Sequence, residues 1–64
     1  MQTATRFLKI REVVAKVGLS RPTIYAKMSA GEFPRPVSLG ARAVAWVSED
    51  VEAWMTARIE ASRR

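Results

Sequence analysis

Cysteine and histidine are absent from this sequence of 64 residues, and glycine and proline occur only three times each. Disulfides and the usual zinc sites are therefore excluded as cross-links that could support so small a hydrophobic core. The longest apolar run is Ala43 to Val47, far below the roughly 18 residues of a membrane span, and no signal-peptide pattern opens the chain. We expect one soluble, cytoplasmic domain that contacts no membrane and needs no cofactor.

Acidic residues are also scarce, because six of them stand against eleven lysines and arginines, which gives a formal net charge of +5. So large a positive charge on so small a body favours an anionic partner. Nucleic acid, an anionic membrane surface and an acidic protein all meet that description, and charge that serves solubility alone is a further alternative. The cations are spread over several short segments instead of one face of a long amphipathic helix, which argues against a membrane surface.

Side chains arranged for catalysis are missing as well. An enzyme would need a nucleophile with its base, a pair of acids or a set of metal ligands. The acids that do cluster are Glu49, Asp50 and Glu52, and they suit the positive end of a predicted helix. We therefore predict that the protein is not an enzyme and has no metal site, whereas a purely protein-binding role, as an antitoxin or adaptor, stays an alternative.

The first predicted helix begins near Ile10, where apolar residues recur at a spacing of three and four. Gly18 can take the left-handed conformation that ends such a helix. A second helix is predicted over Arg21–Ala30, because Ser20 can accept a hydrogen bond from its free amides and Pro22 fits its first turn. Gly31 and then Pro34 stop this second helix.

Two strand-like runs follow, Val37–Leu39 and Ala43–Val47, on either side of a turn that contains Gly40. They predict a β-hairpin. Ser48 is then predicted to cap a third helix, whose apolar stripe should close the core and whose last turns are basic. The stripe consists of Val51, Trp54, Met55 and Ile59.

This order of elements predicts a mainly α fold with a small β-hairpin, organised as a winged helix-turn-helix. We expect a single DNA-binding domain over residues 7–60, with residues 1–6 and 61–64 as flexible tails. Trp46 and Trp54 could stack on the bases of a single strand, but their places on a strand and on an apolar stripe favour burial in the core.

In a helix-turn-helix the first helix braces the second, which lies in the major groove of DNA. If Ile24 and Met28 face inward, the helical step turns Pro22 and Thr23 outward. Arg21 and Thr23 lie near the amino-terminal end of the helix and are the candidates for base contact, although each also fits an ordinary solvated first turn. Pro22 can contribute only shape.

The remaining candidates are expected to contact the DNA backbone. Tyr25 can reach a phosphate through its hydroxyl group or bury its ring against the first helix, and Lys27 is either a phosphate contact or solvated. Arg42 at the hairpin turn and Arg35 just before the first strand can present charge to a flanking minor groove or backbone. As an alternative, both arginines only protect the edges of the hairpin from pairing.

Most of the chain resembles the AlpA family of prophage regulators, roughly from Phe7 to Ile59. The resemblance rests on Phe7-Leu8-Lys9, Glu12-Val13, Gly18-Leu19-Ser20-Arg21, Thr23-Ile24-Tyr25, Gly31-Glu32-Phe33-Pro34-Arg35-Pro36-Val37, Leu39-Gly40, Arg42, Val44, Trp46 and Glu52-Ala53-Trp54. It implies a fold similar to phage excisionases and MerR-type winged helices, with DNA contact through Ser20 to Lys27 and through Arg42. Pro22 departs from the small polar residue expected there, so direct base contacts by this helix are expected to be few.

Two functions remain open at this point. The resemblance favours a transcription regulator that binds double-stranded DNA of specific sequence in a prophage or another integrated element. The alternative is an excision factor, several copies of which would bind side by side and bend an attachment site for a partner integrase. In either role a second copy, as a dimer or a cooperative row, would supply the contacts that one small domain lacks.

Overall fold

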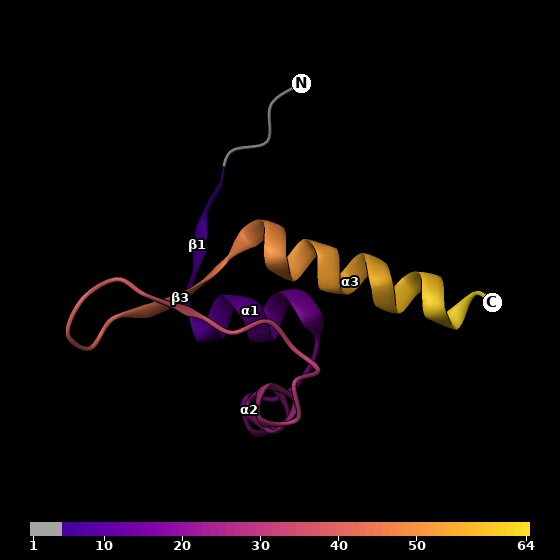
Figure 1. The fold of residues 1–64 in the computed structure, drawn as a ribbon, viewed down its shortest axis with the longest axis horizontal. Coiled ribbons are helices and arrows are strands. Elements are labelled where there is room, and N and C mark those ends of the chain that lie inside the picture. The colour runs from indigo at the N-terminus through magenta and orange to yellow at the C-terminus, as the bar shows by residue number, and fades with distance from the viewer. Residues whose placement is uncertain (1–4) are drawn as a thin grey trace.

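The computed structural model describes residues 5–64, which form three helices and a small sheet (Figure 1). In chain order the elements are β1 (Phe7–Leu8), α1 (Ile10–Val17), α2 (Arg21–Ser29), β2 (Val37–Ser38), β3 (Val44–Val47) and α3 (Ser48–Ser62). Most of the described residues are helical, as the sequence predicts. Of the two tails expected at the ends, residues 1–4 lie outside the described residues, and α3 continues through Ser62.

Helices α1 and α2 are joined by residues 18–20, and both helix ends follow from local side-chain chemistry. Gly18 adopts a φ of 76°, and its amide donates to the carbonyl oxygen of Val14 at 2.9 Å. The hydroxyl oxygen of Ser20 accepts from the amide of Thr23, which satisfies one free donor of the first turn of α2. The predicted turn and the two predicted helices are confirmed.

Helix α2 ends in a Schellman motif centred on Gly31. Gly31 has a φ of 75°. Its amide donates to the carbonyl oxygen of Met28 at 3.0 Å, and the amide of Glu32 donates to the carbonyl oxygen of Lys27 at 2.8 Å. These two hydrogen bonds satisfy carbonyl groups that the helix leaves free. They also turn the chain toward Pro34 and the sheet.

The three strands form one antiparallel sheet in the order β1-β3-β2. The predicted hairpin is present as β2 and β3, with Val37 opposite Ala45 and the amide of Leu39 bonded to Ala43 at 2.7 Å. Strand β1 was not predicted, and it places Leu8 opposite Trp46 on the other edge of β3. The central strand β3 therefore pairs with β1, which precedes the helix pair in the sequence, and with β2, which follows it.

Ser48 does not cap α3, so that prediction is wrong. The helix begins at Ser48 itself, after Val47, and no side chain caps it. Instead, the Ser48 hydroxyl oxygen accepts from the amide of Arg6 at 2.9 Å, and the Ser48 amide donates to the Arg6 carbonyl oxygen at 2.8 Å. The hydroxyl group that a cap would use is therefore already bonded to Arg6, the residue before β1.

The core lies where the sheet, α1, α2 and α3 meet. Its buried members are Leu8, Val13, Ile24, Phe33, Trp46 and Val51. Trp46 is fully buried and Trp54 packs against this cluster, so the structural interpretation of both tryptophans is confirmed. Ile59 is 47% exposed and does not close the core as predicted, because α3 runs past the body of the domain after Met55 (Figure 1). Within residues 5–64, no helix combines the length and hydropathy that crossing a bilayer requires.

Candidate nucleic-acid interface

The first turn of α2 is hydrogen-bonded by its own side chains. Besides accepting from the Thr23 amide, the Ser20 hydroxyl lies 2.9 Å from the Thr23 hydroxyl, and either group can donate. Thr23 is half-buried by this arrangement, whereas Arg21 and Pro22 are exposed. The side chain of Arg21 is thus presented to solvent from a fixed backbone, while Thr23 has one of its hydrogen bonds already committed.

The two faces of α2 are divided as the helical step predicts. Ile24 is fully buried and Met28 packs against the core, so the inward pair is confirmed. Tyr25 is 45% exposed, and no hydrogen bond within residues 5–64 uses its hydroxyl group. Lys27 is half-buried, which fits a side chain whose apolar stem packs while its ammonium group reaches water.

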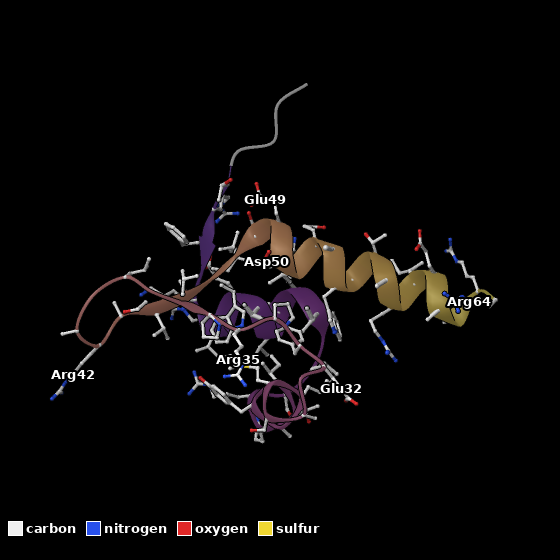
Figure 2. The ribbon with its side chains drawn as sticks, in the orientation of Figure 1. Glu32, Arg35, Arg42, Glu49, Asp50 and Arg64 are labelled. Carbon is white, nitrogen blue, oxygen red and sulfur yellow. The ribbon has the colours of Figure 1, made fainter. Side chains whose placement is uncertain are left out.

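The hairpin carries the other candidate residues. Figure 2 shows Arg42 projecting from the hairpin turn, away from the helices, and Arg35 lies on the loop that joins α2 to β2. Both arginines are exposed. The Ser38 hydroxyl donates to the Gly40 carbonyl oxygen at 3.1 Å and helps to shape this turn.

The acidic residues are kept apart from these cations. Between residues 13 and 48 the sequence contains a single acid, Glu32. The first turn of α2 has no carboxylate, whereas those of α1 and α3 do. Figure 2 shows Glu49 and Asp50 at the start of α3, across the molecule from α2 in this view. The exposed amino-terminal end of α2 can therefore approach an anion without repulsion from a neighbouring acid.

Ion pairs within the described part of the chain also leave the candidate cations available. Arg6 lies 3.6 Å from Glu12, and Lys16 lies 2.6 Å from Glu52. The cations of α2, its following loop and the hairpin enter no ion pair among residues 5–64. These same residues contain no cluster of three metal-ligating side chains. What the site offers is positive charge and hydrogen-bond donors.

A match to a known family accounts for most of the chain. Residues 6–59 match the family described as Prophage CP4-57 regulatory protein (AlpA). The chain belongs to this AlpA family. The match includes α1, α2, the hairpin and all of α3 that packs against the body.

Two relatives of this AlpA-family chain cover most of its length. Protein ORF88 of Enterobacteria phage P4 is 50% identical over 62 residues, which span 97% of this chain and 70% of the phage protein. The DNA-binding transcriptional activator AlpA of Escherichia coli strain K12 is 29% identical over 63 residues, spanning 89% of this chain and 90% of that protein. No solved structure matches the chain.

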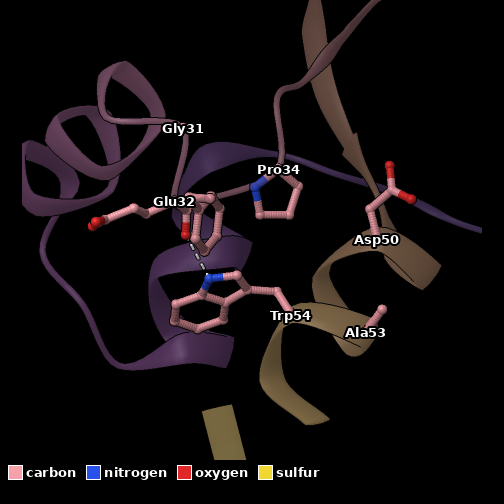
Figure 3. Close-up of a pocket in the computed structure, with 7 residues that line it drawn as sticks. Gly31, Glu32, Pro34, Asp50, Ala53 and Trp54 are labelled. Atoms are coloured by element: carbon pink, nitrogen blue, oxygen red, sulfur yellow. Dashed lines mark hydrogen bonds between the residues drawn. The ribbon is translucent and has the colours of Figure 1, made fainter. Parts of the chain in front are cut away.

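The AlpA-family chain also has a surface that the sequence analysis missed. An open groove lies between α3 and the segment that follows α2, and Figure 3 shows its walls. It is lined by Gly31, Glu32, Phe33, Pro34, Asp50, Ala53 and Trp54. Helical spacing places Trp54 on the apolar stripe of α3. It cannot show that Pro34, from the segment after α2, lines the same groove as Trp54.

Proposed function

We propose that this AlpA-family chain is a transcription regulator that binds double-stranded DNA through a winged helix-turn-helix and recognises specific sites in a prophage or another integrated element. The observation that carries the proposal is the acid-free first turn of α2, where Arg21 and Pro22 are exposed, together with the exposed Arg42 at the hairpin turn. The similarity to the DNA-binding transcriptional activator AlpA of Escherichia coli supports it. We assign the protein to the cytoplasm, at the nucleoid.

In this proposal α1 braces α2 so that the amino-terminal end of α2 enters the major groove. Arg21 would donate two hydrogen bonds to a guanine, and Thr23 would contact a base edge with its methyl group or hydroxyl group. Pro22, between them, would select for shape alone. Since Thr23 is half-buried and bonded to Ser20, Arg21 is assigned the larger share of base discrimination.

The other assigned side chains would hold the domain in register on the backbone. Ser20 and Tyr25 would offer hydroxyl groups to phosphates, and Lys27 would offer its ammonium group. Arg35 and Arg42 would contact the backbone or the minor groove next to the site, as the wing of such a domain does. The protein would catalyse no reaction and would act by occupying its site.

Binding to DNA from around the protein's own gene, measured with competitor DNA at several salt concentrations, tests the proposal. Three phosphate contacts would give a slope of about −3 in log affinity against log salt. A discrete protected site near a promoter would support a regulator. Absence of DNA binding at low salt would contradict the proposal.

The excision-factor alternative is favoured by one feature, the part of α3 that extends past the body and is free to contact a neighbour. Such a factor would bind an attachment site in several copies, and bending that site costs about 1–6 kcal/mol. A cooperative ladder of mobility shifts, with bending detected on circularly permuted probes, would favour this role. A purified integrase that is recruited to the same complex would be the partner.

A further inference from the structure

The second half of α3 adds no residue to the core of the described chain. Met55 is its last residue that packs against the core, and every residue from 56 to 64 is exposed. We call residues 56–63 the arm. It carries Ile59, which is 47% exposed, with Arg58 before it and Glu60 and Arg63 after it along the chain. A helix end without tertiary packing gains little stability of its own, so a contact with a partner would order it.

The groove, as defined above, has an apolar floor and acidic edges. Its volume is about 500 Å³. The rings of Phe33 and Trp54 meet edge to face at 4.8 Å, and the Trp54 indole nitrogen donates to the Glu32 carbonyl oxygen at 2.7 Å. Figure 3 shows the carboxyl groups of Glu32 and Asp50 on opposite sides of the groove. Within residues 5–64, neither carboxylate has an ion-pair or hydrogen-bond partner.

The arm and the groove are complementary in both charge and hydropathy. Along the arm Ile59 lies between Arg58 and Arg63, and with Glu60 included the arm carries two cations and one acid, whereas the apolar floor of the groove is flanked by two carboxylates. DNA cannot fill this groove, because its phosphates would be repelled by both acids. The arm of the same copy cannot fill it either, because Trp54 and Ile59 lie on one continuous helix.

We propose that the arm of one copy docks in the groove of the next copy, head to tail. Such a contact uses two different surfaces, so it generates an open row instead of a closed dimer. The inference rests on the proposed DNA-binding function, because DNA is what aligns the copies. One turn of helix in a shallow groove buries less than the roughly 800 Å² per partner of a stable complex, so the row is expected on DNA and not in dilute solution.

Charge reversal gives the first test. On a duplex from around the protein's own gene, wild-type protein is expected to fill adjacent sites with a cooperativity factor of about ten, and Arg63→Glu or Glu32→Lys to lower it toward one. A mixture of these two variants, or one chain that carries both substitutions, is expected to regain cooperativity. Arg11→Glu on α1 is the control for Arg63→Glu, because it makes the same change in net charge away from the arm.

Binding to a single site separates this inference from the proposed function. Single-site affinity that is equal in the Arg63→Glu and Arg11→Glu variants, which make the same change in net charge, together with rescue in the mixture, supports the head-to-tail contact. Cooperativity that survives both single substitutions, or that is lost without rescue, overturns the contact and leaves DNA binding intact. Loss of transcription without any change in cooperativity would assign the groove to a different protein partner and would also overturn the inference.

The absence of native cysteine allows a second test that does not depend on cooperativity. Arg63→Cys and Glu32→Cys chains are mixed and treated with a short bifunctional thiol reagent, with and without DNA. A cross-linked dimer that forms in the mixture on DNA, and in much smaller amount with either variant alone, supports the contact. Equal cross-linking of each variant alone, or none in the mixture, overturns it.

Discussion

The indole nitrogen of Trp46 on β3 donates a hydrogen bond of 2.9 Å to the backbone carbonyl oxygen of Pro34. Trp46 is fully buried, so its ring also fixes this end of the core. Pro34 lies on the segment between α2 and β2. The bond therefore sets where the hairpin stands relative to the helix proposed to enter the major groove.

Replacement of this indole by a smaller ring should destabilise the whole domain. Trp46→Phe removes the donor and leaves the Pro34 carbonyl oxygen without its bond, which costs about 1–3 kcal/mol, and it also leaves a cavity. We expect a marked fall in the free energy of unfolding by urea, followed by far-ultraviolet circular dichroism. Trp54→Phe is the matched comparison, and an equal or larger loss there would contradict this assignment because Trp54 is only half-buried.

Two glycines should respond differently to the same substitution. Gly18 has a φ of 76° and no atom within 4 Å of an added Cβ, so Gly18→Ala introduces backbone strain of about 1–2 kcal/mol without a clash. Gly40 has equally open surroundings and no positive φ, so Gly40→Ala is expected within about 0.5 kcal/mol of the wild type. Thermal melts of both variants measure the contrast, and similar melting temperatures would show that Gly18 is not under conformational constraint.

Substitutions on the proposed interface should separate specific from general DNA binding. Arg21→Ala is expected to weaken the specific site by about 1–3 kcal/mol and to weaken random DNA less. Lys27→Ala and Arg42→Ala are expected to lower both affinities about equally and to make the salt slope shallower by about one each. Titrations on specific and random duplexes at three salt concentrations measure these effects, and equal behaviour of all three variants would reject the division of roles.

Glu49 should titrate below its ordinary range. The Thr5 hydroxyl donates to its carboxylate at 2.7 Å, and this bond, followed by the backbone amide of Glu49 itself and the Ser48 hydroxyl, lowers the pKa of Glu49. Thr5→Val should move that pKa back toward about 4.3, which an NMR titration of the Glu49 side chain can follow.

The linked effect on stability has a definite sign. Because the folded-state pKa is the lower one, the contribution of Glu49 is fully present above its unfolded pKa of about 4.3 and is lost as the pH falls through the folded value. Wild type and Thr5→Val should therefore differ in stability at neutral pH and converge in acid. A difference that persists unchanged at low pH would contradict the role of the carboxylate.

Local signals explain why the helix pair could be predicted from the sequence. Gly18 and Ser20 define the end of α1 and the start of α2 through bonds to residues three or four positions away. The exposure of Arg21, Arg35 and Arg42 follows in the same way, from helical periodicity and from turn positions. Their contacts with DNA remain predictions.

Signals that act at a distance along the chain explain what could not be predicted. Strand β1 has two residues and no periodicity, and its partner lies far along the sequence. The hydroxyl group of Ser48 fits a cap until Arg6, 42 positions earlier, competes for it. The spacing of Ile59 places it on the same helical stripe as Val51, but the spacing cannot show where the body of the domain ends.

The central position of β3 imposes an order on folding during synthesis. Both helices of the α1–α2 pair emerge from the ribosome before Val47, so Phe7 must wait unpaired until its partner arrives. Until then, Val13 and Ile24 have no sheet or α3 to cover them. The last segments to be made thus complete the domain at its first residues, and the nascent chain passes through a stage in which the segments of α1 and α2 lack most of the core that stabilises them.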